Sequence, residues 1–345
     1  MSGDRPSGRP LALTMGEPAG IGGEIALAAW RDRADRAVPP FVLLDDPARL
    51  AALAGSLGWD VPLVTVADPA EAPGLFGSAL PVLPVALRVP VRYGQPDPAN
   101  GPAVLESIDR AVALCREGRA AAVVTNPIQK SALYATGFRW PGHTEYLAHL
   151  AGQAEEPVML LEGGGLRVVL ATIHIPLKDV PAALSTAGIV RVATATAAGL
   201  TADFGVARPR LAVAALNPHA GESGSLGREE IEIIAPAVAA LQAVGIDAAG
   251  PLPADTLFHP GARSRYDAVV CMYHDQALIP LKTLDFETGV NVTLGLPFVR
   301  TSPDHGTALG IAGTGTASAS SLIAALHTAA RIAARRAARQ DGGAP

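Results

Sequence analysis

A group of polar and charged side chains between residues 266 and 308 offers the clearest chemistry in this sequence. The group interrupts apolar runs and comprises His274, Asp275, Lys282, Asn291, Arg300, Asp304 and His305. Globular proteins rarely place so many such side chains around apolar strand ends unless they converge on a ligand. An imidazole, a carboxylate, a lysine and an arginine can together hold a metal ion and a phosphorylated substrate. We therefore expect the chemistry of the protein in this segment.

Three histidines follow apolar runs that have the pattern of buried strands: His174, His219 and His274 each stand just beyond such a run. In open α/β sheets ligands bind at the carboxyl edge of the strands. Three imidazoles also leave a divalent metal with an open coordination position, as catalytic sites require. Their wide separation along the chain fits no local zinc motif, so structural histidines stay an alternative to metal ligands.

Other side chains could bind an anion. His143 and Thr144 stand at the predicted start of a helix, where backbone N–H groups can grip an anion or Thr144 can cap the helix. Arg300 is either a bidentate clamp for phosphate or carboxylate or a partner in a surface ion pair. Lys282 has the same two interpretations.

The glycine-rich segment 13–27 runs from a predicted strand through a loop into a predicted helix. Its glycines at 16, 20, 22 and 23 form no G-x-G-x-x-G pattern, and no lysine completes a P-loop. A tight structural turn beside a cleft is therefore favoured over a cradle for cofactor phosphate. Glu17 and Glu24 are expected to be solvated or to cap the helix.

Short apolar runs alternate with alanine-rich amphipathic stretches, which is typical of an α/β fold. Strands are predicted at 11–15, 41–44, 121–125, 167–171, 210–215 and 267–272. Helices are predicted at 21–30, 47–57, 101–117, 144–151, 186–203, 228–244 and 317–339. Residues 68–102, rich in proline and glycine, are expected to form a β-rich excursion or a long ordered connection.

The composition limits the partners. The chain has 345 residues, of which 49% are hydrophobic, and a net charge of −5. This charge, without a basic stripe of interleaved aromatics, argues against nucleic acid. No apolar run approaches the roughly 20 residues that span a bilayer, and the first ten residues lack the apolar core of a signal peptide. With two cysteines in apolar contexts, the sequence predicts a cytoplasmic protein with reduced thiols and no membrane contact.

Motifs along nearly the whole chain resemble those of the 4-hydroxythreonine-4-phosphate dehydrogenase family of pyridoxal phosphate biosynthesis. They are GEPAGIG, NPI-K, GHTEYLA, T-HIPL, NPHAGE-G-LG-EE, GP-PADTLF, YHDQALIPLK, VNVTLGLPF-RTS-DHGTA and IAG-G-A. The DHGTA and IAGTG stretches are also similar to the cofactor loop of the isocitrate and isopropylmalate dehydrogenase fold. The resemblance implies a two-domain α/β protomer of that fold, with an active-site cleft between the domains.

The resemblance also implies the bounds of the two domains and the site that each one carries. The first domain would comprise 1–128 plus 296–345 and carry the cofactor loop, and the second would comprise 129–295 and carry the metal and the dimer interface. The implied assembly is a homodimer with one divalent metal per site, zinc first and magnesium or cobalt otherwise. His174, His219 and His274 would bind this metal, with ligands drawn from both subunits.

The matched motifs imply the remaining site residues. Substrate would contact His143, Thr144, Lys282, Asn291 and Arg300, and NAD or NADP would lie along Asp304, His305, Gly306, Thr307, Ala308 and Gly313. The implied reaction oxidises 4-phosphooxy-L-threonine to 2-amino-3-oxo-4-phosphooxybutanoate, which decarboxylates to 3-amino-2-oxopropyl phosphate. Lys282, Asp255 and a water on the metal are the alternatives for taking the hydroxyl proton, and we favour Lys282 assisting the metal.

Alternatives to this function come from three classes. Paralogous dehydrogenases that oxidise phospho-threonate, phospho-erythronate or a cis-dihydrodiol would keep the same three histidines. A metal-dependent hydrolase of a phosphorylated metabolite and a non-catalytic sugar-phosphate sensor are further alternatives. The DHGTA and IAGTG stretches favour a dehydrogenase, because a hydrolase has no use for a cofactor loop.

Overall fold

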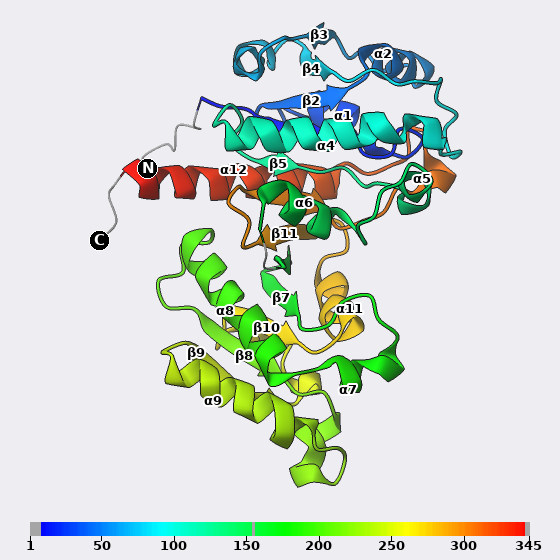
Figure 1. Ribbon diagram of the computed structural model, residues 1–345. Helices are drawn as coiled ribbons and strands as arrows, with labels where there is room; N and C mark the ends of the chain where they lie inside the picture. The colour runs from blue at the N-terminus through cyan, green and yellow to red at the C-terminus, as the bar shows by residue number, and fades with distance from the viewer. Residues whose placement is uncertain (1–7, 154–155, 342–345) are drawn as a thin grey trace. The chain divides into compact units, whose positions relative to one another are not determined.

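The computed structural model describes residues 8–153 and 156–341 and has a mixed α/β architecture, as the sequence predicts (Figure 1). Residues 1–7, 154–155 and 342–345 lie outside this description. The chain divides into two compact units, Met1–Pro157 with Leu296–Pro345, and Val158–Gly295. Residues 129–157, predicted to start the second domain, belong to the first unit because their apolar side chains, including Leu133, Phe138 and Leu147, join its core.

The first unit contains a parallel sheet with strand order β3-β4-β2-β1-β5-β12. These strands are β1 (Leu11–Thr14), β2 (Phe41–Asp45), β3 (Leu63–Thr65), β4 (Leu80–Pro84), β5 (Val123–Val124) and β12 (Arg300–Pro303). Every residue of β1 and β2 is buried. Continuous burial is expected of parallel strands, because helices cover both faces of such a sheet.

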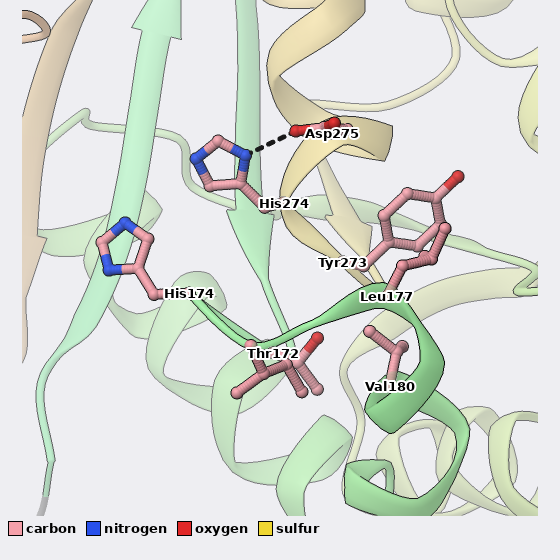
Figure 2. A pocket seen from close by; sticks show the side chains of 8 residues that line it. Thr172, His174, Leu177, Val180, Tyr273, His274 and Asp275 are labelled. Carbon is pink, nitrogen blue, oxygen red and sulfur yellow. Dashed lines mark hydrogen bonds and ion pairs between the residues drawn. The ribbon is translucent and has the colours of Figure 1, made fainter.

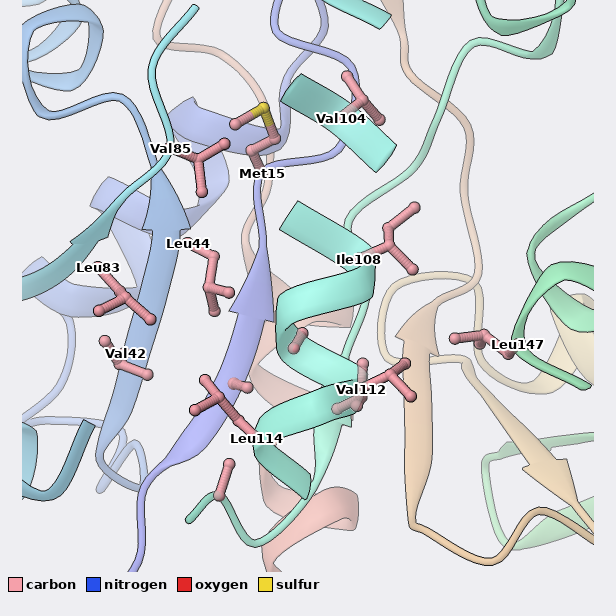
Figure 3. Close-up of a cluster of buried hydrophobic side chains, with 14 of the residues drawn as sticks. Met15, Val42, Leu44, Leu83, Val85, Val104, Ile108, Val112, Leu114 and Leu147 are labelled. Carbon is pink, nitrogen blue, oxygen red and sulfur yellow. The ribbon is translucent and has the colours of Figure 1, made fainter. Parts of the chain in front are cut away.

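The helices of the first unit pack on this sheet. They are α1 (Gly22–Arg31), α2 (Pro47–Ser56), α3 (Ala72–Leu75), α4 (Gly101–Arg116), α5 (Lys130–Tyr134), α6 (His143–Ala151) and α12 (Ser320–Asp341), with 3₁₀ turns η1 (Pro69–Glu71), η2 (Pro98–Asn100) and η7 (Leu309–Ile311). Helix α4 packs against β1, β2 and β5, and α12 packs against β12 and β5. Between α4 and the strands lies an apolar core that includes Met15, Leu44, Ile108 and Val112 (Figure 3).

The second unit has strand order β11-β6-β7-β10-β8-β9. The strands are β6 (Val158–Gly163), β7 (Leu166–Leu170), β8 (Arg210–Ala214), β9 (Asp247–Leu252), β10 (Ala268–Cys271) and β11 (Val290–Leu294). β6 pairs antiparallel with β7 and β11, whereas β7, β10, β8 and β9 run parallel. The carboxyl ends of β7, β10 and β8 therefore meet at one edge of the sheet, as predicted for the three histidines.

Short turns and longer helices complete the second unit. The helices are α7 (Val180–Ala183), α8 (Thr186–Ala202), α9 (Ala235–Ala243), α10 (Pro260–Arg263) and α11 (His274–Leu284). The 3₁₀ turns are η3 (Leu177–Asp179) and η6 (Ala254–Thr256), and a π-helical turn, η5 (Glu230–Ile234), precedes α9. The segment η4 (Pro218–Gly224) contains residues with left-handed backbone angles. Ser185 caps α8 by accepting a hydrogen bond from Gly188 N at 3.1 Å, a bond that satisfies one unpaired donor of the first turn.

Two further expectations concern cysteines and membrane spans. Both cysteines are free; Cys271 is buried and Cys115 half-buried. Among the described helices, none alone is long and apolar enough to cross a membrane. The bent pair Leu177–Ala183 and Thr186–Ala202, which meet at 93°, passes the length and composition test only when the two are joined.

Candidate functional site

A pocket of about 280 Å³ lies in the second unit beyond the carboxyl ends of β7 and β10 (Figure 2). It is lined by Thr172, His174, Ile175, Leu177, Val180, Tyr273, His274 and Asp275. The Thr172 hydroxyl donates to the Met272 carbonyl oxygen at 2.7 Å, which ties the two loops together. Because β7 and β10 are parallel neighbours, residues just beyond their ends face one shared edge, where α/β sheets bind ligands. We call this site the histidine pocket.

Two of the predicted metal ligands meet in the histidine pocket. The rings of His174 and His274 have their centroids 5.7 Å apart. His274 Nδ1 lies 2.7 Å from Asp275 Oδ1, and a carboxylate at one ring nitrogen fixes the tautomer and the orientation of a metal-binding imidazole. Imidazoles bound to one tetrahedral zinc at 2.0–2.1 Å would place their centroids about 5 Å apart, so this pair fits part of a zinc site.

The third predicted ligand, His219, stands in an unusual left-handed turn. Five consecutive residues, 219–223, have positive φ angles between 43° and 74°. Left-handed residues other than glycine cost about 1 kcal/mol or more each, so the surrounding structure must hold them. Glu230 does part of this: its Oε1 accepts hydrogen bonds from Leu216 N at 2.9 Å and Asn217 N at 2.7 Å. His174 also has a positive φ, 44°, and such strain clusters at functional sites.

Within the described residues, the three histidines do not gather into one group. Across residues 8–153 and 156–341, no three His, Cys, Asp or Glu side chains lie close enough together to hold a metal ion. The chain brings His174 and His274 side by side and leaves His219 apart from this pair as a ligand group.

The other predicted residues of the second unit lie outside the lining of the histidine pocket. Lys282 is in the last turn of α11, with its Nζ 5.4 Å from the ring centroid of Phe286. Asp255 is exposed in the turn η6. Asn291 lies in β11, and its Oδ1 is buried without a hydrogen-bond partner, a position that a ligand's donor can satisfy.

A second group of candidate residues lies in the first unit. Arg300 of β12 is 4% exposed and donates to Thr125 Oγ1 from Nε at 3.2 Å and from Nη2 at 2.7 Å. The surface ion pair considered for this residue is therefore wrong, because the side chain is buried. Burial lowers the pKa of Arg300 to about 10, and Glu145 partly opposes that shift. The guanidinium thus keeps its charge at neutral pH.

His143 begins α6 and faces the same charges. Its Nε2 is buried and has no hydrogen-bond partner in the described part of the chain. Burial, followed by the charges of Arg300 and Lys130, holds the pKa of His143 well below its usual range. The imidazole is therefore neutral at pH 7, with one ring nitrogen available to a ligand. Thr144 does not cap the helix, because the N-cap is Gly142 and no side chain bonds to the first turn.

Lys130 was not among the predicted site residues. Both Lys130 and Glu145 border the start of α6. If Gly142 carried a side chain, its Cβ would lie 3.5 Å from Lys130 Nζ and 3.3 Å from Glu145 Oε2. The lysine is exposed and close enough to His143 to affect its pKa. The only sequence signal for it is its place after β5 in the NPI-K motif. We call Lys130, His143 and Arg300 the basic cluster.

The predicted cofactor residues form a loop between β12 and α12. Asp304 N donates to Ser321 Oγ at 3.0 Å, and Thr307 Oγ1 donates to Gln129 Oε1 at 3.2 Å. His305 Nδ1 lies 3.0 Å from the Gly306 carbonyl oxygen, while its Nε2 is buried without a partner. Ala308 has a φ of 44° and Gly313 a φ of 77°. An unpaired buried ring nitrogen in this loop fits a site for a polar ligand.

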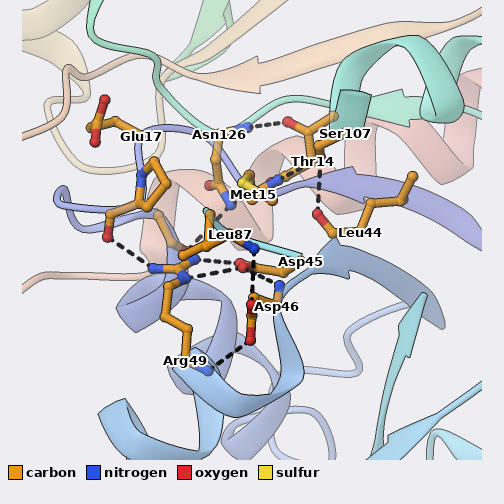
Figure 4. Close-up of polar contacts among 12 residues, drawn as sticks. Thr14, Met15, Glu17, Leu44, Asp45, Asp46, Arg49, Leu87, Ser107 and Asn126 are labelled. Atoms are coloured by element: carbon orange, nitrogen blue, oxygen red, sulfur yellow. Dashed lines mark hydrogen bonds and ion pairs between the residues drawn. The ribbon is translucent and has the colours of Figure 1, made fainter. Parts of the chain in front are cut away.

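The glycine-rich segment forms a tight turn behind this loop, the interpretation that the sequence favours over a phosphate cradle. Ile21 N donates to the Thr307 carbonyl oxygen at 3.1 Å. The expectation that Glu17 and Glu24 are solvated is wrong, since they are 4% and 0% exposed. Nearby, buried Arg49 bonds to both carboxylate oxygens of Asp45 and donates to the Pro18 carbonyl oxygen at 2.9 Å (Figure 4).

Known proteins resemble this chain over most of its length. A family model described as "Pyridoxal phosphate biosynthetic protein PdxA" matches residues 37–329. The 4-hydroxythreonine-4-phosphate dehydrogenase of Caulobacter vibrioides is 55% identical over 95% of this chain and 98% of its own. A crystal structure of the enzyme of that name from Klebsiella pneumoniae has a TM-score of 0.85 and 41% identity, covering 94% of this chain and 99% of that one. A terephthalate 1,2-cis-dihydrodiol dehydrogenase from Burkholderia xenovorans has a TM-score of 0.62 and 32% identity, over 94% and 98%.

Proposed function

Since this chain belongs to the PdxA family of 4-hydroxythreonine-4-phosphate dehydrogenases, oxidoreductases of pyridoxal phosphate biosynthesis, we propose that it oxidises 4-phosphooxy-L-threonine with NAD or NADP. The product would be 2-amino-3-oxo-4-phosphooxybutanoate, which loses CO₂ to give 3-amino-2-oxopropyl phosphate. The observation that carries a phosphorylated substrate is the basic cluster, because its charges and its unpaired nitrogen suit a phosphate group, and the family match favours 4-phosphooxy-L-threonine among such substrates.

The basic cluster supplies complementary contacts for a phosphate group. Arg300 is charged and buried, and a guanidinium in such a place binds phosphate more strongly than it would in water. His143 is neutral, so it can offer a hydrogen bond from Nε2 without adding a further charge to be desolvated. Lys130 adds a screened charge at the exposed side. Thr144 and Asn291 are proposed as further substrate contacts, with Asn291 Oδ1 as an acceptor for a substrate donor.

The reaction needs a hydride acceptor and a proton acceptor. The carbinol hydrogen leaves with its electron pair for the nicotinamide ring, and the hydroxyl proton passes to a base, so the alcohol becomes a ketone. We propose Lys282 as the group that assists this proton transfer, with Asp255 as the alternative. The resulting β-keto acid then releases CO₂, because the neighbouring ketone accepts the electron pair of the breaking bond.

We propose that a divalent metal, zinc first, is held by His174 and His274, with His219 as the third imidazole. The pair in the histidine pocket supports the first two ligands, and a homodimer that shares the site would supply the missing one. When bound, the metal would lower the pKa of the substrate hydroxyl. Asp275 would orient the His274 ring through its hydrogen bond to Nδ1.

We propose that the nicotinamide cofactor binds along Asp304, His305, Gly306, Thr307, Ala308 and Gly313. The unpaired His305 Nε2 supports a polar ligand there. The glycine-rich segment 16–24 would support this loop without contacting phosphate itself. This role agrees with the absence of a G-x-G-x-x-G pattern among its glycines.

A second candidate substrate is a cis-dihydrodiol, because a protein named as a dehydrogenase of such a compound shares 32% identity and a TM-score of 0.62 with this chain. That substrate carries no phosphate, so the basic cluster would have to bind another group of it, such as a carboxylate. Phospho-threonate and phospho-erythronate would satisfy the basic cluster as well as 4-phosphooxy-L-threonine does.

The proposal is tested by following NADH and NADPH formation with 4-phosphooxy-L-threonine, with a chelator and after zinc is added back. We expect turnover that disappears with the chelator and returns with zinc. Turnover only with phospho-threonate, phospho-erythronate or a dihydrodiol would replace the substrate. No cofactor reduction with any of the four would overturn the proposed oxidation.

A further inference from the structure

We propose that Glu24 is a positioning residue that holds the 304–317 loop in the conformation that receives the nicotinamide cofactor. The inference rests on the proposed function, since that function assigns the cofactor to this loop. It gives the glycine-rich segment 16–24 a role different from the phosphate cradle that its composition suggests.

Glu24 connects two segments that are far apart in the sequence. It lies in the first turn of α1 and is completely buried. Its Oε2 accepts a hydrogen bond from Gly313 N at 2.8 Å, and its Oε1 accepts one from Ala317 N at 3.1 Å. Hydrogen bonds from N–H groups to a carboxylate are about twice as strong as neutral ones, so Glu24 fixes the carboxyl-terminal part of the loop.

The other part of the loop is fixed by the same segment. Ile21 N donates to the Thr307 carbonyl oxygen at 3.1 Å, and a Cβ on Gly20 would lie only 2.9 Å from that oxygen. Glycine is therefore required at position 20 so that the two backbones can approach. The loop is thus held at Thr307 by the glycine-rich segment and at Gly313 and Ala317 by Glu24.

Burial of the Glu24 carboxylate is compensated locally. Its two accepted hydrogen bonds and its place in the first turn of a helix both stabilise negative charge. The Arg49 guanidinium borders the neighbouring Gly23, since a Cβ there would be 3.1 Å from its Nη1, but it forms its ion pair with Asp45. Tyr93 packs on the loop as well: a Cβ on Gly313 would lie 2.7 Å from its ring.

A loop held in advance loses less conformational freedom when a ligand binds, so its affinity is higher. Removal of the Glu24 charge should therefore weaken cofactor binding more than it weakens binding at the basic cluster. A purely structural residue would instead affect both sites together through the fold.

The test compares Glu24→Gln with Glu17→Gln in the full-length protein. Glu17 is a matched control, because it is buried in the same segment and, among the described residues, accepts only a local hydrogen bond, from Ala19 N at 3.0 Å. Calorimetric titration measures the affinity for NAD(H) and NADP(H) without turnover. Hydrogen exchange of peptides covering 305–318 reports the Gly313 and Ala317 amides directly.

We expect Glu24→Gln to weaken cofactor affinity about tenfold, since it replaces a charged acceptor by an amide that can satisfy only one of the two N–H groups. Exchange in 305–318 should become faster, while the KM for the phosphorylated substrate changes by less than about twofold. Glu17→Gln should match the wild type in all three measurements. Gly20→Ala, which leaves Glu24 in place but crowds Thr307, should also weaken cofactor binding.

Each other outcome overturns the inference in a distinct way. Unchanged cofactor affinity and exchange in Glu24→Gln would show that the loop does not need the carboxylate. Equal weakening of cofactor and substrate binding, together with a lower Tm, would show a general structural role. A wild-type protein that binds neither NAD(H) nor NADP(H) would overturn the proposed function itself, which the variants cannot do.

Discussion

The basic cluster of the first unit and the histidine pocket of the second differ in how completely one chain builds them. In the basic cluster, Arg300 is buried against Thr125 and His143 is kept neutral by burial and neighbouring cations. In the histidine pocket, the ring of His174 is exposed, and His219 is held elsewhere in a left-handed turn. The comparison separates a cluster whose members are already gathered within the described residues from a pocket that gathers only two of the three histidines proposed as ligands.

The largest expected effect concerns His219, the third ligand proposed for a metal at the histidine pocket. His219→Ala should abolish zinc binding and lower kcat/KM by about 10³-fold, because the proposed metal would lower the barrier by several kcal/mol. Zinc per chain by elemental analysis and far-UV circular dichroism measure the effect and the fold. His259→Ala, another exposed histidine of the second unit, is the matched control and should keep both metal and activity. Full zinc content in His219→Ala would remove this histidine from the ligand set.

A smaller effect is expected at the basic cluster. Arg300→Ala should raise the KM for the phosphorylated substrate about 30-fold, because bonds from charged groups contribute roughly 1.5–3 kcal/mol. Arg300→Lys should have a smaller effect, since it keeps the charge and loses the planar fork. Initial rates at saturating cofactor measure the change, with Arg336→Ala, which loses a bond to the Leu296 carbonyl, as the control. An unchanged KM in Arg300→Ala would exclude this residue from the anion site.

Lys130 should have a weaker influence because it is exposed and screened. We expect Lys130→Met to raise the same KM about fivefold and to reduce its dependence on salt. Because the lysine charge lowers the pKa of His143, the variant should also raise that pKa, which NMR titration of the ring protons can measure. If neither quantity changes, Lys130 is a surface residue and the basic cluster contains only His143 and Arg300.

The smallest effect is a pH dependence of stability. Native His143 stays neutral, whereas the unfolded chain binds a proton at this side chain below about pH 6.5. The free energy of unfolding should therefore fall as pH decreases below that value, by at most about 1.4 kcal/mol per pH unit. Urea unfolding at about pH 7.5, 6.5 and 5.5 tests this. His143→Gln should show a shallower decrease, and an equal slope in both proteins would contradict the assignment.

The sequence predicts those parts of the fold whose signal is local. The runs that became β1, β2, β8 and β10 are short, apolar and bounded by turn residues, so their assignment needs no tertiary information. Strand β12, with the sequence Arg-Thr-Ser-Pro, is fully buried but has no apolar signal. Helix α11 contains Pro280, which argues against a helix in any single-sequence prediction. Both elements carry proposed site residues.

The candidate site shows the same limit. The position of three histidines just beyond strand ends could be predicted, because it follows from the alternation of strands and helices, but only His174 and His274 meet in one pocket. The burial of Glu24 could not, because its partners Gly313 and Ala317 are 289 and 293 positions away. Lys130 was missed for a similar reason, since its relation to His143 depends on how α5 and α6 pack.

The register of β12 against β5 has a consequence for synthesis on the ribosome. Arg300 pairs with Val123, so the sheet of the first unit cannot close until the last part of the chain has been translated. The second unit is a continuous segment, Val158–Gly295, and all its strands emerge earlier. The second unit of a nascent chain should therefore fold before the sheet of the first unit is complete. Until β12 is translated, the edge of β5 stays unpaired and can form incorrect strand pairs.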